Sequence, residues 1–404
     1  MLEHYVELEG ADSAIGQLAT WLGTIASADS NAVQTLFGGL LGSVYGLLQF
    51  VFATIWGGLS DRTGRRPTLL LTLTGTVCAC VLWVFAGSFM ILVAARILGG
   101  IMAGNISTAS AAVADTTSSK DRAKGMGMVG MAIGLGFILG PALGGFLAGW
   151  RLDSGSTATF ALNPFSGPAI ASALLAIINL VWVWKRFPET LPQDRRAKSE
   201  TRSLNPLSRL KSLNLPGIAT TNTLYLVYLT AFAGVEFTLS FLAVGRFNFS
   251  HQELAWMFVF VGLIIAFVQG GIVRRAAPRF GERAVARAGM LLTMPGFYML
   301  GEAGTVGELY GGLAFMAVGS ALVMPCLSAL VSRYAPADRQ GLALGTFRSM
   351  GSLSRALGPI IGAGIYWKLG SSAPYLGGAV VIMIPLLMTL SLPTPTDFEE
   401  KELA

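Results

Sequence analysis

The chain has 404 residues, of which 53% are hydrophobic and only 12% charged, and its mean hydropathy is +0.62. Soluble domains carry about 25% charged residues, so this chain lacks the polar surface that a water-soluble fold needs. Its net charge of +6 comes from short loops between apolar runs, which excludes disordered, fibrous and nucleic-acid-binding classes. The composition predicts an integral, multi-pass protein of the lipid bilayer, in the plasma membrane or an intracellular organelle membrane.

An all-α polytopic fold is expected because 11 segments are apolar enough and long enough to cross a bilayer core of about 30 Å. Seven of them contain no charged residue. Residues 1–35 hold five acidic residues and no Lys or Arg, so no span is predicted there. The predicted spans are 36–56, 68–87, 90–114, 126–149, 167–184, 219–245, 254–273, 284–303, 309–332, 341–366 and 374–392.

The loops between these spans alternate in charge. One set carries 21 of the 28 basic residues, and by the positive-inside rule this set is cytoplasmic. The longest loop of this set, 185–218, holds eight basic residues and is predicted to link two halves of the chain. The predicted organisation is an extracytoplasmic segment at 1–35, an N-terminal helical bundle at 36–184, a cytoplasmic linker at 185–218, a C-terminal helical bundle at 219–392 and a cytoplasmic tail at 393–404.

An internal repeat relates the two halves at an offset of about 217 residues. Parallel repeats of this kind occur in secondary transporters, which place the substrate site between the repeats near the bilayer midplane. The equivalent of span 219–245 would fall on residues 2–28, which hold four acidic residues. Either the first half has only five helices, or its first helix lies upstream of Met1 and the chain is truncated; we favour truncation because six helices in each half restore the symmetry. The matching positions are Gly64 with Gly281, Asp121-Arg122 with Asp338-Arg339, and Gly140-Pro141-x-x-Gly144 with Gly358-Pro359-x-x-Gly362.

The loop at 57–66 carries the most specific motif, Gly-Gly-Leu-Ser-Asp-Arg-Thr-Gly-Arg-Arg. It resembles the signature loop of the major facilitator superfamily, Gly-x-Leu-Ala-Asp-Arg-x-Gly-Arg-Arg, and departs from it only at Ser60. The patterns at 96–104 and 134–145 resemble the family's fourth-helix arginine motif and the fifth-helix motif of its drug–proton antiporter branch. The sequence segments 36–43, 235–242 and 348–355 most closely resemble the animal tetracycline-transporter-like proteins of this superfamily, which are thought to transport organic anions and drugs.

The resemblance implies two pseudo-symmetric six-helix bundles that work by alternating access, with 11 spans present here. It also implies that Asp61, Arg65 and Asp115 form a salt-bridged latch at the cytoplasmic end; the alternative is solvated loop charges. In that family a helix with an acidic residue precedes the segment with which this sequence begins. That helix is missing here, so it stays open which residue would supply the coupling carboxylate. The gating residues expected are Asp61, Arg62, Gly64, Arg65, Arg66, Asp115 and Arg122.

Four charged residues lie inside predicted spans and are candidates for substrate and proton coupling: Arg96, Glu236, Arg348 and Arg355. A lone charge at the centre of a membrane helix costs about 2.5–3.5 kcal/mol, so it faces a cavity or a partner. Arg348 and Arg355 are seven residues apart and share a helix face. Two readings stay open: a structural Glu–Arg pair, or an Arg355 that receives an anion while Glu236 carries a proton.

Small residues in the spans are expected to allow close helix packing, and prolines to permit bends. These positions are Gly136, Gly140, Pro141, Gly144, Gly358 and Pro359.

The function expected is secondary active transport, coupled to protons, of organic anions or amphipathic drugs. The alternatives are a sugar or lipid carrier of the same fold, or a non-transporting receptor or scaffold, including an inactive truncated form. No nucleophile–base set, metal cluster or phosphate-binding loop is visible, so neither an enzyme nor a cofactor is expected. The expected partners are a small-molecule substrate, the proton and the bilayer, without nucleic acid.

Overall fold

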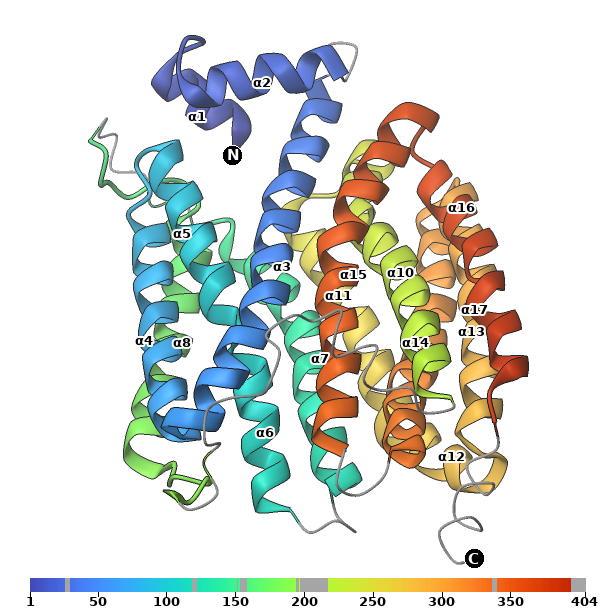
Figure 1. Cartoon of the computed structure of the whole chain (residues 1–404). Coiled ribbons are helices and arrows are strands. Elements are labelled where there is room, and N and C mark those ends of the chain that lie inside the picture. The colour runs from blue at the N-terminus through green and yellow to red at the C-terminus, as the bar shows by residue number, and fades with distance from the viewer. Residues whose placement is uncertain are drawn as a thin grey trace, which may run out of the picture.

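The computed structural model describes residues 1–25, 30–117, 122–150, 158–193, 217–335 and 340–393, with Leu152 and Arg196. This part of the chain is helical and contains no β-strand, as expected (Figure 1). The first half comprises α1 (Leu2–Glu9), α2 (Ala14–Ile25), α3 (Ser30–Thr63), α4 (Arg65–Val84), α5 (Phe89–Met102), η1 (Ala103–Asn105), α6 (Ile106–Thr116), α7 (Arg122–Leu147) and α8 (Ser166–Arg186). The second half comprises α10 (Ile218–Phe247), α11 (His251–Phe267), the π-helix η3 (Val268–Val273), α12 (Arg274–Phe280), α13 (Glu282–Glu302), α14 (Val306–Tyr334), α15 (Gln340–Leu369), α16 (Ala373–Val381), α17 (Met383–Met388) and η5 (Thr389–Ser391).

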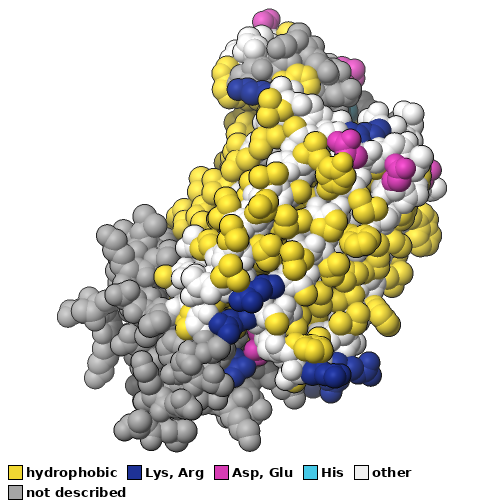
Figure 2. Space-filling view, turned by 90° about the vertical axis from the view of Figure 1, so that its right-hand side faces the viewer, with side chains coloured by type: hydrophobic (Ala, Val, Ile, Leu, Met, Phe, Trp, Pro, Cys, Tyr) yellow, Lys and Arg dark blue, Asp and Glu magenta, His cyan; other side chains and the backbone are white. Residues whose placement is uncertain are grey.

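Each of the 11 predicted spans falls on a helix or on consecutive helices. Within the described residues, eight helical segments are long and apolar enough to cross a membrane. The other three predicted spans, 126–149, 284–303 and 341–366, form α7, α13 and α15. Figure 2 shows apolar side chains covering the middle of one face, with charged side chains towards its two ends. This distribution suits a protein surrounded by lipid tails.

The turn that repeats between the halves has the same backbone shape in both. Gly64 joins α3 to α4 with φ of 108° and ψ of 158°, and Gly281 joins α12 to α13 with φ of 79° and ψ of 149°. Glycine suits both positions because positive φ strains other residues. The second matched pair of the repeat, at 121–122 and 338–339, lies outside the described residues apart from the backbone of Arg122.

Two lines of helix contact join the halves: α3 against α15, and α7 against α11. Small residues make the approach close. A Cβ built on Gly39 would lie 3.1 Å from the Pro359 carbonyl oxygen, and one on Gly145 would lie 2.9 Å from the Ala255 Cβ. In a bilayer such contacts hold helices together by van der Waals packing.

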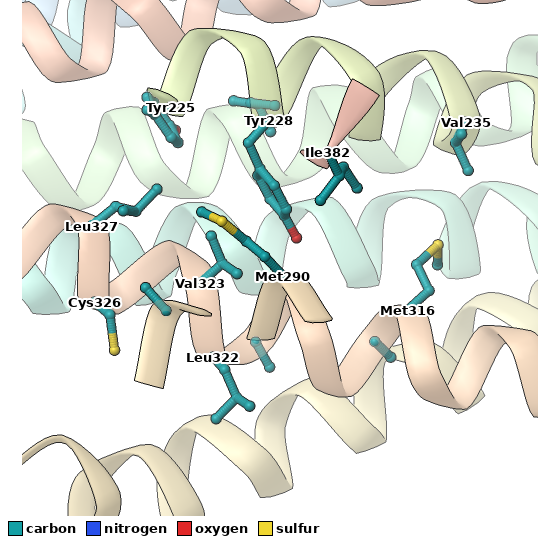
Figure 3. Packing of buried hydrophobic residues seen from close by; sticks show 14 of the residues in the cluster. Tyr225, Tyr228, Val235, Met290, Met316, Leu322, Val323, Cys326, Leu327 and Ile382 are labelled. Carbon is teal, nitrogen blue, oxygen red and sulfur yellow. The ribbon is translucent and has the colours of Figure 1, made fainter. Parts of the chain in front are cut away.

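The second half has a dense apolar core between α10, α13 and α14, shown from close by in Figure 3. Two pairs of buried hydroxyl groups lie in this core, where an unpaired polar group would be costly. The Tyr228 hydroxyl lies 3.2 Å from the Thr293 hydroxyl, and the Thr238 hydroxyl donates to the Tyr375 oxygen at 3.3 Å.

Residues 1–25 form two helices too short to span a membrane, and they lie across the end of the first half that is opposite the 57–66 loop (Figure 1). The Tyr5 hydroxyl donates to the Ala86 carbonyl at 2.7 Å. The Glu9 carboxylate accepts from the Phe89 N–H at 2.6 Å and so caps the first turn of α5. The first span was predicted to begin at residue 36, whereas the corresponding helix, α3, begins at Ser30. Most of the predicted linker and tail lies outside the described residues.

Candidate functional site

An ion-pair cluster occupies the end of the first half that the sequence predicts to be cytoplasmic. Arg65, only 7% exposed, donates through Nη1 to Asp61 at 2.6 Å and through Nε to Asp115 at 2.9 Å. The same Nη1 donates to the Ser60 hydroxyl at 2.7 Å, so the residue that departs from the family motif supplies an additional acceptor. One guanidinium thereby links the ends of α3, α4 and α6. We call Asp61, Arg65 and Asp115 the latch.

Glu189, which lies beyond the end of α8, completes this end of the molecule. Its carboxylate accepts from the backbone N–H groups of Arg65 at 2.9 Å, Arg66 at 3.3 Å and Leu191 at 2.9 Å. Burial raises the pKa of Glu189, but these hydrogen bonds and the charge of Arg196 outweigh it and hold the pKa below its usual range. A carboxylate is stabilised at the N-terminus of α4 by the helix dipole.

Gly64 makes the approach of Glu189 possible. A Cβ at this position would lie 2.3 Å from the Glu189 Oε2. Of the other expected gating residues, Arg66 donates to the Trp184 carbonyl at 2.8 Å and thereby ties α4 to α8. Arg62 is exposed. The side chain of Arg122 lies outside the described part.

The charged residues inside the membrane gather where the two halves meet. Glu236 of α10 interacts electrostatically with Arg355, and Arg355 with Arg348, its neighbour two turns away on α15. Arg355 is midway along α15. The structure therefore brings together three of the four residues that the sequence singled out.

Two tyrosines join this group, and sequence reasoning missed both. The Tyr225 hydroxyl sits against α15 between the two arginines, where a Cβ on Gly351 would lie 2.8 Å from it, and its ring stacks on Phe347 at 3.9 Å. Tyr45 of α3 interacts electrostatically with both Arg96 and Arg355. The presence of a tyrosine hydroxyl inside an apolar span is the feature of the sequence that could have identified both residues.

Arg96 of α5 belongs to the first half and lies over the Trp83 ring, 4.2 Å from its centroid. Its Nε is buried and has no hydrogen-bond partner within the described part of the chain. Tyr45 interacts electrostatically with Arg96 of the first half and with Arg355 of the second half, so Tyr45 connects the arginines of the two halves.

The predicted packing glycines divide into two groups. Gly358 seats α15 against α10, since its Cβ would lie 2.7 Å from the Ala233 Cβ. Gly362, which was not among the predicted packing positions, does the same, with a Cβ 2.6 Å from the Gly234 carbonyl oxygen. Pro359 lies against α3, where its carbonyl oxygen is close to Gly39.

The expectation for α7 needs correction in this structure. A Cβ on Gly136, Gly140 or Gly144 would meet no atom of the described residues within 4 Å, so these glycines seat none of the described helices. Gly145 instead makes the close contact, with α11. Helical spacing identifies a face but does not show which face has a neighbour. The side chain of Pro141 lies outside the description.

Comparison with known proteins agrees with this architecture. The Major Facilitator Superfamily pattern matches residues 14–279 and 272–403. The bovine "Major facilitator superfamily domain-containing protein 10" is 38% identical over 390 residues, covering 91% of this chain and 82% of that protein. The Escherichia coli "Tetracycline resistance protein, class C" is 29% identical and covers 90% of this chain and 87% of that protein.

Among solved structures, the crystal structure of the human organic anion transporter MFSD10 (TETRAN) superposes with a TM-score of 0.80. It is 33% identical to this chain, and the match covers 96% of this chain and 92% of that one. With these matches, the intact loop at 57–66 and the all-helical arrangement, the chain belongs to the major facilitator superfamily, as an integral multi-pass membrane protein of a transporter family.

Proposed function

We propose that this protein is a proton-coupled carrier of organic anions, in which Arg355 binds the anion and Glu236 carries the proton. The observation that carries the proposal is Arg96, a buried arginine whose electrostatic partners in the described part of the chain are the Tyr45 phenol and the Cys80 thiol and include no carboxylate. On the other side of the boundary between the halves, Glu236 interacts with Arg355. Because an uncompensated arginine is costly within the membrane, such a site favours an anion as its occupant. The similarity to a protein titled an organic anion transporter points the same way.

The coupling follows from the position of Arg355 between two possible partners. While Glu236 is ionised it attracts the Arg355 guanidinium. When Glu236 takes up a proton, Arg355 loses that attraction and is available to an arriving anion. Proton binding and anion binding then support each other, and this is the requirement for coupled movement.

Alternating access needs two bodies that move against each other. We propose that residues 36–184 and 219–392 are these bodies, and that the α3–α15 and α7–α11 contacts are where they slide or part. The latch lies wholly within the first body, where it would stabilise one arrangement of α3, α4 and α6.

The test is uptake of naphthalene-2-carboxylate into vesicles reconstituted with the full chain. Arg355→Gln should abolish uptake, and Arg355→Lys should restore it poorly, because a forked guanidinium binds a carboxylate through two hydrogen bonds and an ammonium does not. Glu236→Gln should leave anion binding intact and remove its pH dependence. Arg275→Gln, an exposed arginine of α12, is the control and should change nothing. An Arg355→Gln protein that is inserted normally and binds the anion with unchanged affinity would show that the site is elsewhere.

A further inference from the structure

The last helix of the first half, α8, carries an exposed stripe whose chemistry changes along its length. Leu175 and Ile178 are 57% and 62% exposed, and Trp182 follows one turn later with 69% exposed. The final turn carries Lys185 and Arg186, which are both exposed. Residues spaced by three or four positions share a helix face. The stripe therefore runs from apolar through tryptophan to basic, which is the order of acyl chain, interface and headgroup in a lipid leaflet.

Arg66, near the start of α4, lies beside the basic end of this stripe. Its Nη2 donates to the Trp184 carbonyl at 2.8 Å, and α4 and α8 pack side by side (Figure 1). Trp184 is itself 60% exposed. Tryptophan is enriched at membrane–water interfaces because its ring is apolar and its N–H is polar. We call this group the basic corner: Arg66, Trp182, Trp184, Lys185 and Arg186.

The second half shows which part of the basic corner the fold itself requires. Arg283 stands 217 residues after Arg66, and its Nη1 donates to the Leu392 carbonyl, just beyond the last helix of the second half. The tie between the two helices is therefore present in both halves. Residues 373–393, which include the last span of the second half, contain no Trp, Lys or Arg. The tryptophans and the basic pair of α8 are thus not needed for this helix packing.

An anionic phospholipid has the features that the basic corner can bind. Its acyl chains match the apolar part of the stripe, and basic pockets beside membrane helices bind anionic headgroups. Arginine suits a phosphate because its forked guanidinium can donate two parallel hydrogen bonds. Glu189, the acidic residue that follows α8, accepts from the backbone N–H groups of Arg65 and Arg66, so its carboxylate is directed at the start of α4.

We propose that the basic corner binds the headgroup of an anionic phospholipid, whose acyl chains lie along the apolar part of the α8 stripe. Lys185 and Arg186 donate to its phosphate, and Arg66 adds positive charge beside them. Trp182 and Trp184 flank the glycerol at the level of the interface. This site is independent of the substrate that the protein carries.

The test compares two lipids with identical acyl chains, dioleoylphosphatidylglycerol and dioleoylphosphatidylcholine. Their binding to the purified full chain in detergent is measured by native mass spectrometry. The wild type should bind the phosphatidylglycerol at least about tenfold more tightly, since each Lys or Arg near a membrane surface contributes about fivefold. Inorganic phosphate, which lacks the acyl chains, should not displace it.

Variants at the exposed end of α8 locate the site. Lys185→Gln and Arg186→Gln should each lower the affinity for phosphatidylglycerol about fivefold and leave that for phosphatidylcholine unchanged. Arg186→Lys keeps the charge and should retain most of the preference. The control removes two exposed arginines of α12, Arg274→Gln with Arg275→Gln, and should change neither affinity. Thermal unfolding without added lipid verifies that each variant is folded.

Four outcomes would overturn the lipid site. The first is equal affinity of the wild type for the two lipids. The second is a folded Lys185→Gln, Arg186→Gln double variant with unchanged preference for phosphatidylglycerol. The third is an equal loss in the α12 control, which would assign the binding to positive charge in general. The fourth is displacement by inorganic phosphate, which would assign the basic corner to a soluble anion.

Discussion

Asp61→Asn tests whether the latch controls the transport cycle or only holds the fold together. In the structure the Asp61 Oδ1 accepts from Arg65 at 2.6 Å, and the two side chains are 19% and 7% exposed. At this degree of burial the pair is shielded from solvent screening. A hydrogen bond to a charged group contributes about 1.5–3 kcal/mol, against about 0.5–1.5 kcal/mol for a neutral one. Asparagine keeps an acceptor oxygen for Arg65, which stays charged, so only the attraction between the two charges is lost. That loss is about 1–1.5 kcal/mol, the spread between a strong and a weak hydrogen bond to a charged group.

That free energy corresponds to a factor of about 5–10 in the population of the latched state. If the latched state is a necessary step of the cycle, turnover should fall by the same factor while the amount of inserted protein stays the same. The assay is anion uptake into reconstituted vesicles, normalised to inserted protein, with Asp12→Asn as a control that removes an exposed carboxylate outside the latch. Equal losses of inserted protein and uptake would assign the latch to folding. Unchanged turnover would exclude it from the cycle.

Two further predictions concern stability, both measured by thermal unfolding in detergent. Gly362→Ala should destabilise the protein by about 1–3 kcal/mol through overpacking against α10. The control is Gly364→Ala, in open space on the same helix, which should be neutral or stabilising by up to about 1 kcal/mol. Equal unfolding temperatures of the two variants would refute the close contact at Gly362. The pKa of Glu189 is lowered in the folded state, so the ionised Glu189 carboxylate stabilises the fold. This contribution is fully present above the unfolded-state pKa of about 4.3 and is lost as the pH falls through the folded-state pKa. The wild type should therefore unfold at a higher temperature than Glu189→Gln at pH 7, with a difference that shrinks below about pH 4; a difference independent of pH would contradict this.

The sequence predicts the helices of this fold well because insertion into lipid places a strict demand on local composition. Twenty apolar residues in a row have few alternatives to a membrane helix, and every predicted span is a helix. The salt-bridged latch was also predicted, because the motif at 57–66 resembles the signature loop of the superfamily and that resemblance implies pairing of Asp61, Arg65 and Asp115. The cap formed by Glu189 was not, because it joins residues 124 positions apart.

The site between the halves was only partly predictable, for a related reason. Charges within apolar spans stand out in any sequence, so Arg96, Glu236 and Arg355 were found. Tyr45 contrasts much less with its surroundings, because most of a tyrosine side chain is apolar and only its hydroxyl is polar. Its position follows from which face of α3 meets α5 and α15, and hydropathy does not distinguish the faces of a helix that is apolar all round.

The continuity of α3 suggests how the parts of the proposed mechanism would act together. Asp61 lies 16 residues from Tyr45 on this one helix, a rise of about 24 Å at 1.5 Å per residue. The outer part of the same helix packs against α15 through Gly39 and Gly46. If α3 moves as one body, opening the latch at its C-terminal end would tilt Tyr45 relative to Arg355. The gate and the anion site would then be coupled mechanically through α3, without the need for a chain of side-chain contacts between them.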